Sequence, residues 1–211
     1  MLSMLALGGL AMSLLGPPLA TEPALAPPPD KITIEVVTVN GSGCPAGTVA
    51  VATAADNTAF TVTYSDYLAQ VGVGARPTDF RKNCQLSLRV NVPQGFTYAI
   101  AQADYRGFAH LQRGATGMQR AGYYFMGTSP TAYRSHSFAG PVSDNWQATD
   151  ATEVVSLVYA PCGEVRNLNV NTELRVSAGT SNPATTTSFM AMDSTDGSVS
   201  TTYHFDWKRC D

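Results

Sequence analysis

The stretch NCQLSLRVNVPQG, residues 83–95, alternates apolar and polar side chains. Its apolar row holds Cys84, Leu86, Leu88, Val90 and Val92, and its polar row holds Gln85, Ser87, Arg89 and Asn91. Successive side chains of a β-strand point to opposite faces, so one row faces a core and the other faces water or a partner. The stretch therefore predicts a strand of an antiparallel sheet, ended by Pro93 and Gly95.

A second stretch, LNVNTELRVSA at residues 168–178, follows the same pattern. Its first row is Leu168, Val170, Thr172, Leu174 and Val176, and its second row is Asn169, Asn171, Glu173, Arg175 and Ser177. Two strands with one apolar face and one polar face are typical of sheets that cover a core on one side only. The polar rows are either solvated surface or a contact face.

Further segments rich in β-branched and aromatic residues follow at short intervals, with Gly, Pro, Asn and Asp between them. The predicted strands cover residues 32–39, 48–54, 58–64, 84–92, 96–114 with an interruption near Gly107, 122–127, 152–163, 168–179, 185–192 and 198–207. No segment after the first 16 residues shows a convincing helical period. The sequence predicts an all-β fold, an antiparallel β-sandwich of jelly-roll or immunoglobulin-like layout with two disulfides.

The chain has 211 residues, of which 44% are hydrophobic and 14% charged, and this is enough for one sizeable core. We expect a signal peptide at 1–20, a Pro-rich, extended and exposed linker at 21–30 and a single β-sandwich domain at 31–211. The apolar run at 1–16 is shorter than the roughly 20 residues that a membrane span needs. Cleavage after Ala20 fits the signal pattern, and cleavage after Ala26 remains an alternative.

Charge and cysteine content narrow the class of protein. The net charge of −3 comes without a basic cluster, so no nucleic-acid partner is expected. No membrane span is expected either, because the apolar run is too short for one. The four cysteines, in a chain that looks secreted, favour disulfides. Three pairings exist, and we expect Cys44 with Cys84 and Cys162 with Cys210, because these close the shorter loops. Each would stabilise the fold by roughly 4 kcal/mol in the chain-entropy description. No metal site and no cofactor are predicted.

Several short motifs together resemble one family of secreted proteins. The motifs are GSGCPAG (41–47), RKNCQLSLRV (81–90), YRGFAHLQRG (105–114), YYFMG (123–127), PCG (161–163), LNVNTELRVSA (168–178) and MDSTDG (192–197), followed by Trp207 and Cys210. The family is known as domain of unknown function number 4360 and occurs in filamentous fungi and bacteria. The resemblance implies secretion, structural cysteine pairs and an all-β fold. It implies no catalytic residue, because no activity is established for the family.

Candidate residues for chemistry are scattered. His110, His136 and His204 lack the close spacing of zinc ligands, and a Ser, His and acid triad stays open because its members are neighbours only in space. Three glutamates, Glu153, Glu164 and Glu173, lie in or beside predicted strands, where acids are usually solvated. Asp193, Asp196 and Gly197 match half of a calcium loop, and a turn explains them better.

Aromatic residues and one sequon complete the candidates. The YYFMG motif, Tyr133, Trp146 and Trp207 could stack on sugars if they are exposed, but most are expected in the core, Trp207 in a row with Phe205 and Tyr203. Asn40, in the sequence Asn-Gly-Ser, is a candidate N-glycosylation site.

These features favour a secreted, non-enzymatic extracellular module with a structural, adhesive or assembly role at a cell surface or in a matrix. The segment KITIEVVTV, residues 31–39, could pair with the sheet edge of a second copy and build a fibre, or it could be the first strand of its own sandwich. The alternative function is a carbohydrate-binding module for extracellular glycans. A hydrolase ranks third, because no catalytic motif is present.

Overall fold

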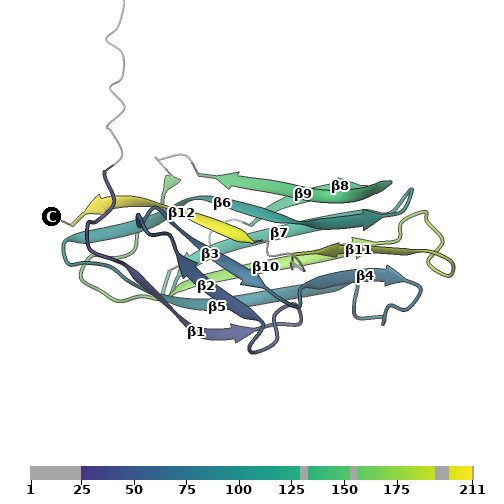
Figure 1. Cartoon of the computed structure of the whole chain (residues 1–211), viewed down its shortest axis with the longest axis horizontal. Coiled ribbons are helices and arrows are strands. Elements are labelled where there is room, and N and C mark those ends of the chain that lie inside the picture. The colour runs from purple at the N-terminus through teal and green to yellow at the C-terminus, as the bar shows by residue number, and fades with distance from the viewer. Residues whose placement is uncertain (1–24, 129–132, 153–155, 193–199, 211) are drawn as a thin grey trace, which may run out of the picture.

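The computed structural model describes residues 25–128, 133–152, 156–192 and 200–210. The expected signal peptide at 1–20 lies outside these residues. The molecule is elongated, its strands run along the long axis, and the first described residues lie at the same end as the C-terminus (Figure 1). None of the described residues belongs to a helix long and apolar enough to cross a membrane.

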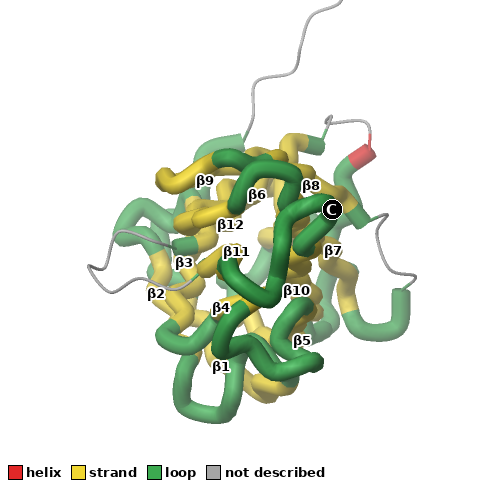
Figure 2. Tube along the Cα trace, turned by 90° about the vertical axis from the view of Figure 1, so that its right-hand side faces the viewer, coloured by secondary structure: helices red, strands yellow, loops and turns green. Residues whose placement is uncertain are grey.

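The described residues form twelve strands. They are β1 (Thr33–Asn40), β2 (Val49–Thr53), β3 (Ala59–Tyr64), β4 (Leu68–Gly72), β5 (Arg81–Asn91), β6 (Phe96–Leu111), β7 (Thr116–Phe125), β8 (Arg134–Ala139), β9 (Val142–Ala151), β10 (Leu168–Ser177), β11 (Thr187–Ala191) and β12 (Thr201–Arg209). One sheet has the order β1-β5-β10-β7-β8. The other has the order β2-β3-β12-β6-β11-β4, with β9 also paired to β6. All the pairings are antiparallel, and the two sheets pack as two layers (Figure 2), which confirms the predicted sandwich.

The two alternating stretches lie side by side in the five-stranded sheet. The first is β5 and the second is β10, which pairs with β5 on one edge and β7 on the other. The apolar rows of both are buried, apart from half-buried Val92, which lies just beyond β5. Burying such rows stabilises the fold by roughly 25 cal/mol per Å² of apolar surface removed from water. The polar rows lie on the outer face, as the alternation predicts.

Three strands were missed and one was predicted wrongly. No strand was predicted over β4, β8 or β9, whereas residues 156–163 of the predicted strand at 152–163 form none. In β9 the buried side chains are Trp146, Ala148 and Asp150, so a small residue and an acid hide its alternation. The segment at 156–163 is held beside the start of β6 by separate hydrogen bonds, among them that from Ala160 N to Tyr98 O at 2.9 Å.

β6 is continuous, so the predicted interruption near Gly107 is wrong. The β9 pairing runs through Gly107 without a shift. What changes there is the partner on the other edge, because β12 pairs with Phe96–Tyr105 and β11 with Phe108–His110. A Cβ on residue 107 would lie 2.0 Å from the carbonyl oxygen of Ala191 and 2.5 Å from the Trp146 ring. The glycine is therefore required by close packing rather than by a bend.

The core between the sheets is rich in aromatic side chains. Trp207, Phe205 and Tyr203 form the buried row that their alternation predicts. The rings of Phe60 and Tyr203 are stacked with centroids 4.9 Å apart. Tyr64, Tyr67, Tyr98, Tyr105 and Tyr203 are the tyrosines buried to 2% exposure or less. Burial raises the pKa of each of these five phenols above the ordinary value of 10.0.

The two disulfides join Cys44 to Cys84 and Cys162 to Cys210, the pairing that loop length favours. Cys44 and Cys84 are buried and attach the turn after β1 to β5. Cys162 is exposed and Cys210 is half-buried, and their bond attaches the loop after β9 to the end of β12.

The segment KITIEVVTV supplies β1, which pairs with β5 of its own chain. Ile32, directly before β1, is fully buried, so this segment is part of the folded sandwich. The structure therefore contains the second alternative: the segment is the first strand of its own sandwich and is not an arm donated to a second copy. The register of β1 shifts between Val36 and Thr38, which leaves Val37 without a partner on β5.

The described part of the Pro-rich segment, residues 25–30, is docked through Pro28, although Ala26, Pro29 and Asp30 are exposed as expected. Pro28 is buried, and the side chain of Asn57, in the turn between β2 and β3, holds the segment in place. The Asn57 amide donates to the carbonyl oxygens of Pro28 at 2.9 Å and Asp30 at 2.8 Å, and its oxygen accepts from Ile32 N at 3.2 Å. The Trp207 indole donates to the Asn57 carbonyl at 3.0 Å. Asn57 has φ of 58°, a conformation that Asn tolerates.

Replacing Asn57 by Asp tests this attachment. The variant keeps the size of the side chain, but it replaces two N–H donors by a carboxylate facing two carbonyl oxygens in a buried site. We expect Asn57→Asp to lower the free energy of unfolding by about 3 kcal/mol or more, measured by urea titration of tryptophan fluorescence. The control Asn145→Asp, at an exposed position of β9, should change it by less than about 0.5 kcal/mol. Equal stability of the two variants would contradict the role of Asn57.

Candidate functional site

The outer face of the five-stranded sheet carries the polar rows of β5 and β10, and it is hollowed between β5 and β7. Register across the strands places Glu173 between Asn83 and Arg120, and Asn171 between Gln85 and Gly122. The hollow has a volume of about 170 Å³. It is lined by Arg81, Asn83, Cys84, Gln85, Arg120, Tyr133, Asn171, Thr172 and Glu173. We call it the Tyr133 hollow.

Tyr133 forms one wall of this hollow because Gly122 leaves room for its ring. A Cβ on residue 122 would lie 2.9 Å from the Tyr133 ring. The guanidinium of Arg120 lies over the ring, 4.1 Å from its centroid, in a cation–π contact. The amide of Asn171 donates to the Tyr133 hydroxyl at 3.4 Å. Tyr133 is nevertheless 44% exposed, so a large part of its surface is open to a ligand.

Glu173 lies at the floor of the hollow, held by two arginines. Arg81 donates from Nε to Glu173 Oε2 at 2.8 Å and from Nη2 to the same oxygen, while Arg175 Nη2 donates to Oε1 at 2.8 Å. Glu173 is only 8% exposed. Burial by itself would raise its pKa, but the hydrogen bonds and charges of Arg81 and Arg175 outweigh burial and lower the pKa below its ordinary value. The expectation that strand acids are solvated is wrong for this residue.

Arg120 is an arginine of the site whose charge is not paired with a carboxylate of the described residues. It lies directly across from Glu173 in the register of β7 and β10, but Glu173 is paired with Arg81 and Arg175. The Nε atom of Arg120 is buried without a hydrogen-bond partner in the described part of the chain. The hollow thus combines an aromatic ring, planar amides and guanidinium groups on one rigid sheet, which are the groups that bind hydroxyl-bearing and anionic ligands.

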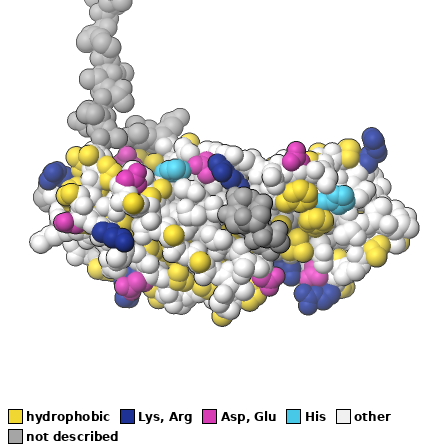
Figure 3. Space-filling model, viewed as in Figure 1, with side chains coloured by type: hydrophobic (Ala, Val, Ile, Leu, Met, Phe, Trp, Pro, Cys, Tyr) yellow, Lys and Arg dark blue, Asp and Glu magenta, His cyan; other side chains and the backbone are white. Residues whose placement is uncertain are grey.

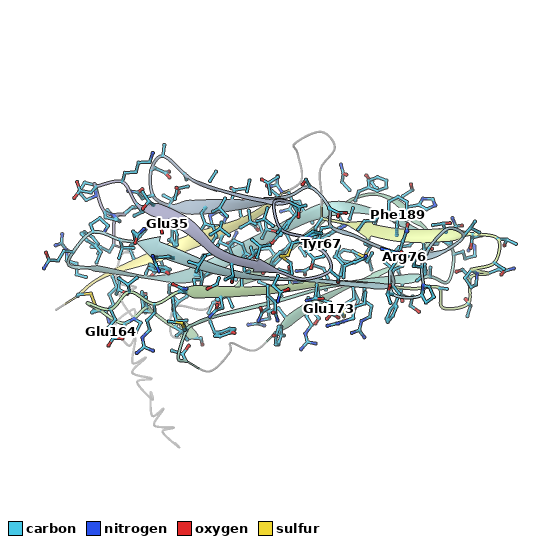
Figure 4. All side chains as sticks on the ribbon, turned by 90° about the horizontal axis from the view of Figure 1, so that it is seen from below. Glu35, Tyr67, Arg76, Glu164, Glu173 and Phe189 are labelled. Atoms are coloured by element: carbon cyan, nitrogen blue, oxygen red, sulfur yellow. A yellow bond between two sulfur atoms is a disulfide. The ribbon has the colours of Figure 1, made fainter. Side chains whose placement is uncertain are left out.

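A second, larger hollow of about 600 Å³ lies at the end of the sandwich, beside the Cys162–Cys210 bond. Its walls are the turn between β5 and β6 and the loop at 160–166, so apolar residues such as Val92, Phe96 and Val165 line it together with polar ones. The charged pair in this loop, Glu164 and Arg166, joins at 2.8 Å. Figure 4 places Glu164 toward one end of the molecule and Glu173 near the middle, so these two acids do not form a catalytic pair.

The structure does not bring the three histidines together. His110 contacts Ser143 through Nδ1 at 3.1 Å and the amide of Gln112 through Nε2 at 3.0 Å. His136 and His204 bind carboxylates instead, those of Asp150 and Asp104, each at 2.8 Å. Within the described ranges no histidine contacts both a serine and a carboxylate, so these residues form no Ser, His and acid triad.

The remaining candidates fall in different places. Glu153, Asp193, Asp196 and Gly197 lie outside the described residues. Trp146 and Trp207 are buried, at 7% and 4% exposure, and are not available to a ligand. Asn40 is exposed at the end of β1, opposite Gln85 in the register. It therefore belongs to the same sheet as the Tyr133 hollow.

Sequence reasoning named Tyr133 among the aromatics but missed Arg120 and the burial of Glu173. Their proximity depends on the register of β7 against β10, for which the sequence has no local signal. No group of three or more His, Cys, Asp or Glu is placed to hold a metal ion in the part of the chain that the structure describes. On the face drawn in Figure 3, charged side chains of both signs are scattered.

Comparison with known proteins gives three findings. A family model described as Domain of unknown function (DUF4360) matches residues 30–210. The chain is 36% identical over 185 residues to an "Uncharacterized secreted protein" of Arthroderma benhamiae, covering 88% of this chain and 74% of that relative. A solved structure, the enzymatically active domain of bacteriophage CBA120 tailspike protein 4, aligns with 82% of this chain and 19% of its own length, at 11% identity and a TM-score of 0.25. This last likeness is too weak to support an argument.

The Glu173 cluster predicts a stability that depends on pH. Because the pKa of Glu173 is lowered in the folded state, its ionised form stabilises the fold above the ordinary value of 4.5, and this contribution is lost as the pH falls through the lowered folded value. We expect Glu173→Gln to lower the free energy of unfolding by about 1–2 kcal/mol at pH 7, discounted for the half-exposed arginines. The difference from the wild type should shrink toward pH 3 in urea titrations.

The control for this prediction is Glu35→Gln. Glu35 is an exposed acid of β1, 3.6 Å from Arg89, and we expect a change below about 0.5 kcal/mol at pH 7. A Glu173→Gln effect that is the same at pH 7 and pH 3 would show that packing, and not the ion pairs, accounts for the loss.

Proposed function

The chain belongs to the DUF4360 family. We propose that it is a non-enzymatic extracellular module that binds glycans in the Tyr133 hollow and thereby has an adhesive role at a cell surface or in a matrix. It is a secreted protein, consistent with its two disulfides. The observation that carries the proposal is the exposed Tyr133 ring beside the side chains of Asn171, Gln85 and Glu173.

The chemistry of these groups suits a sugar. The apolar C–H face of a sugar ring packs on an aromatic ring, while its hydroxyls both donate and accept hydrogen bonds. Asn171 and Gln85 offer an N–H donor and a carbonyl acceptor each, and Asn83 adds a third amide to the lining. The amides come from two strands of one sheet, β5 and β10, and the ring comes from the residue before β8, so the amides are fixed by the hydrogen-bonded framework.

The shape of the site suits a chain of sugars. At about 170 Å³ the hollow is smaller than the roughly 300 Å³ at which pockets for drug-sized ligands begin. It is therefore suited to one ring unit, while the rest of the chain would lie on the open sheet face. The polar side chains of Ser87, Asn169 and Asn91 continue that face along β5 and β10.

Tyr133→Ala tests the proposal. We expect the wild-type protein to bind oligosaccharides on an array of cell-wall glycans, and Tyr133→Ala to weaken binding to the best ligand at least about 10-fold in titration calorimetry, because stacking on the ring is lost. The control is Phe189→Ala, which removes a half-buried aromatic ring from the seven-stranded sheet and should leave affinity unchanged. Empty arrays with the wild type, or equal affinity of Tyr133→Ala and wild type, would overturn the proposal.

We propose self-association through the edge of β1 as a second function. In the described part of the chain β1 pairs with β5 only, and its side chains Val36 and Val37 are 38% and 43% exposed. An edge strand with exposed β-branched residues can add a strand of a second copy. Because β1 already belongs to its own sheet, this association is edge-to-edge and not strand donation.

A charge at the edge tests self-association. We expect the wild type to form oligomers in light scattering as its concentration rises, and Val37→Lys to remain a monomer at the same concentrations, since charged side chains block edge pairing. The control Val165→Lys, at a 70% exposed loop position, should associate like the wild type. A wild type that stays monomeric throughout would exclude this function.

A further inference from the structure

We propose that the Tyr133 hollow selects glycans that carry an anionic group, with a sugar carboxylate bound by Arg120. This inference rests on the proposed function and specifies its ligand class. Three arginines and one acid lie at the hollow. Arg81 and Arg120 line it together with the acid Glu173. The third arginine, Arg175, lies beside the hollow and donates to Glu173. The local balance is two positive charges in excess.

The arrangement of these charges leaves Arg120 without an anion of its own. Both carboxylate oxygens of Glu173 are occupied, one by Arg81 and one by Arg175. The side chain of Arg120 makes no hydrogen bond or ion pair within the ranges that the structure describes, and its Nε is buried. Because Nε is enclosed by the protein, only the terminal N–H groups of this hollow-lining guanidinium can meet a ligand, and an anionic acceptor offers them a stronger, charge-assisted hydrogen bond than a neutral hydroxyl does.

The position of Arg120 is fixed by its surroundings. Its guanidinium lies over the Tyr133 ring, and this contact reduces the rotamer entropy lost when a ligand binds. Stacking on Tyr133 and pairing with Arg120 would act on the same sugar unit, because the two side chains are in contact. A carboxylate is planar and matches the guanidinium fork, so a uronic acid is the preferred source and a sulfated sugar the alternative.

The experiment compares a ligand with its own neutral form. Oligogalacturonate is titrated into the full chain beside the methyl ester of the same oligomer, which keeps ring, length and linkage but removes the charge. We expect the acid to bind at least about 10-fold more tightly than the ester at low salt, and the difference to shrink as salt screens the pair. Arg120→Gln should abolish the difference, while Arg89→Gln, on the same sheet but outside the hollow, should keep it.

The outcomes distinguish failure of the anionic selection from failure of glycan binding itself. If acid and ester bind equally and Tyr133→Ala weakens both, the site binds glycans but the anionic selection is wrong. If neither these ligands nor the glycan array shows binding, the proposed function itself fails. A sulfated oligosaccharide that competes for Arg120 while the uronate does not would assign the anion to sulfate and overturn the uronate preference. Arg120→Lys, which keeps the charge and loses the fork, should retain only part of the selectivity, and unchanged thermal unfolding of each variant shows that it is folded.

Discussion

The close approach at Gly107 is the constraint on which the seven-stranded sheet depends. Here β6 exchanges one partner for another along the same edge, from β12 to β11, while β9 stays paired on the opposite edge. The carbonyl of Ala191 and the indole of Trp146 occupy the space that any side chain would need. β11 and β12 therefore act as two segments of one edge partner, and β4 extends the sheet beside the first of them.

The other sheet uses a glycine for a different purpose. Gly122 interrupts the row of outer side chains on β7 and gives Tyr133 a place to lie, so a flat strand surface acquires a wall and a hollow. In the seven-stranded sheet the missing side chain of Gly107 allows backbone to approach closely. In the five-stranded sheet the missing side chain of Gly122 allows a ring to lie on the surface. The rigidity of the core between the two sheets, with its stacked and edge-to-face aromatic rings, fixes the positions of these surface groups.

The parts of this fold that the sequence predicted are those in which one strand carries the whole signal. The alternation in β5 and β10 and the row Tyr203, Phe205 and Trp207 each need only a period of two. β9 was missed because Ala148 and Asp150 fill its buried positions, and residues 156–163 were assigned to a strand because apolar character alone does not provide a pairing partner. The docking of the Pro-rich segment depends on Asn57, which reads as an ordinary turn residue, and the Tyr133 hollow depends on register between strands far apart in sequence.

The buried phenols of the core have a consequence for spectroscopy. Five tyrosines are hidden from solvent with their pKa raised, so in the folded protein they stay neutral at pH values where an exposed phenol ionises. Their neutral form stabilises the fold fully below pH 10, and this stabilisation falls as alkali ionises the unfolded chain. Phenolate absorbance in alkali would then rise in two stages, the first from surface rings and the second only as the sheets separate. The absorbance of the buried tyrosines therefore reports whether the two sheets are packed together.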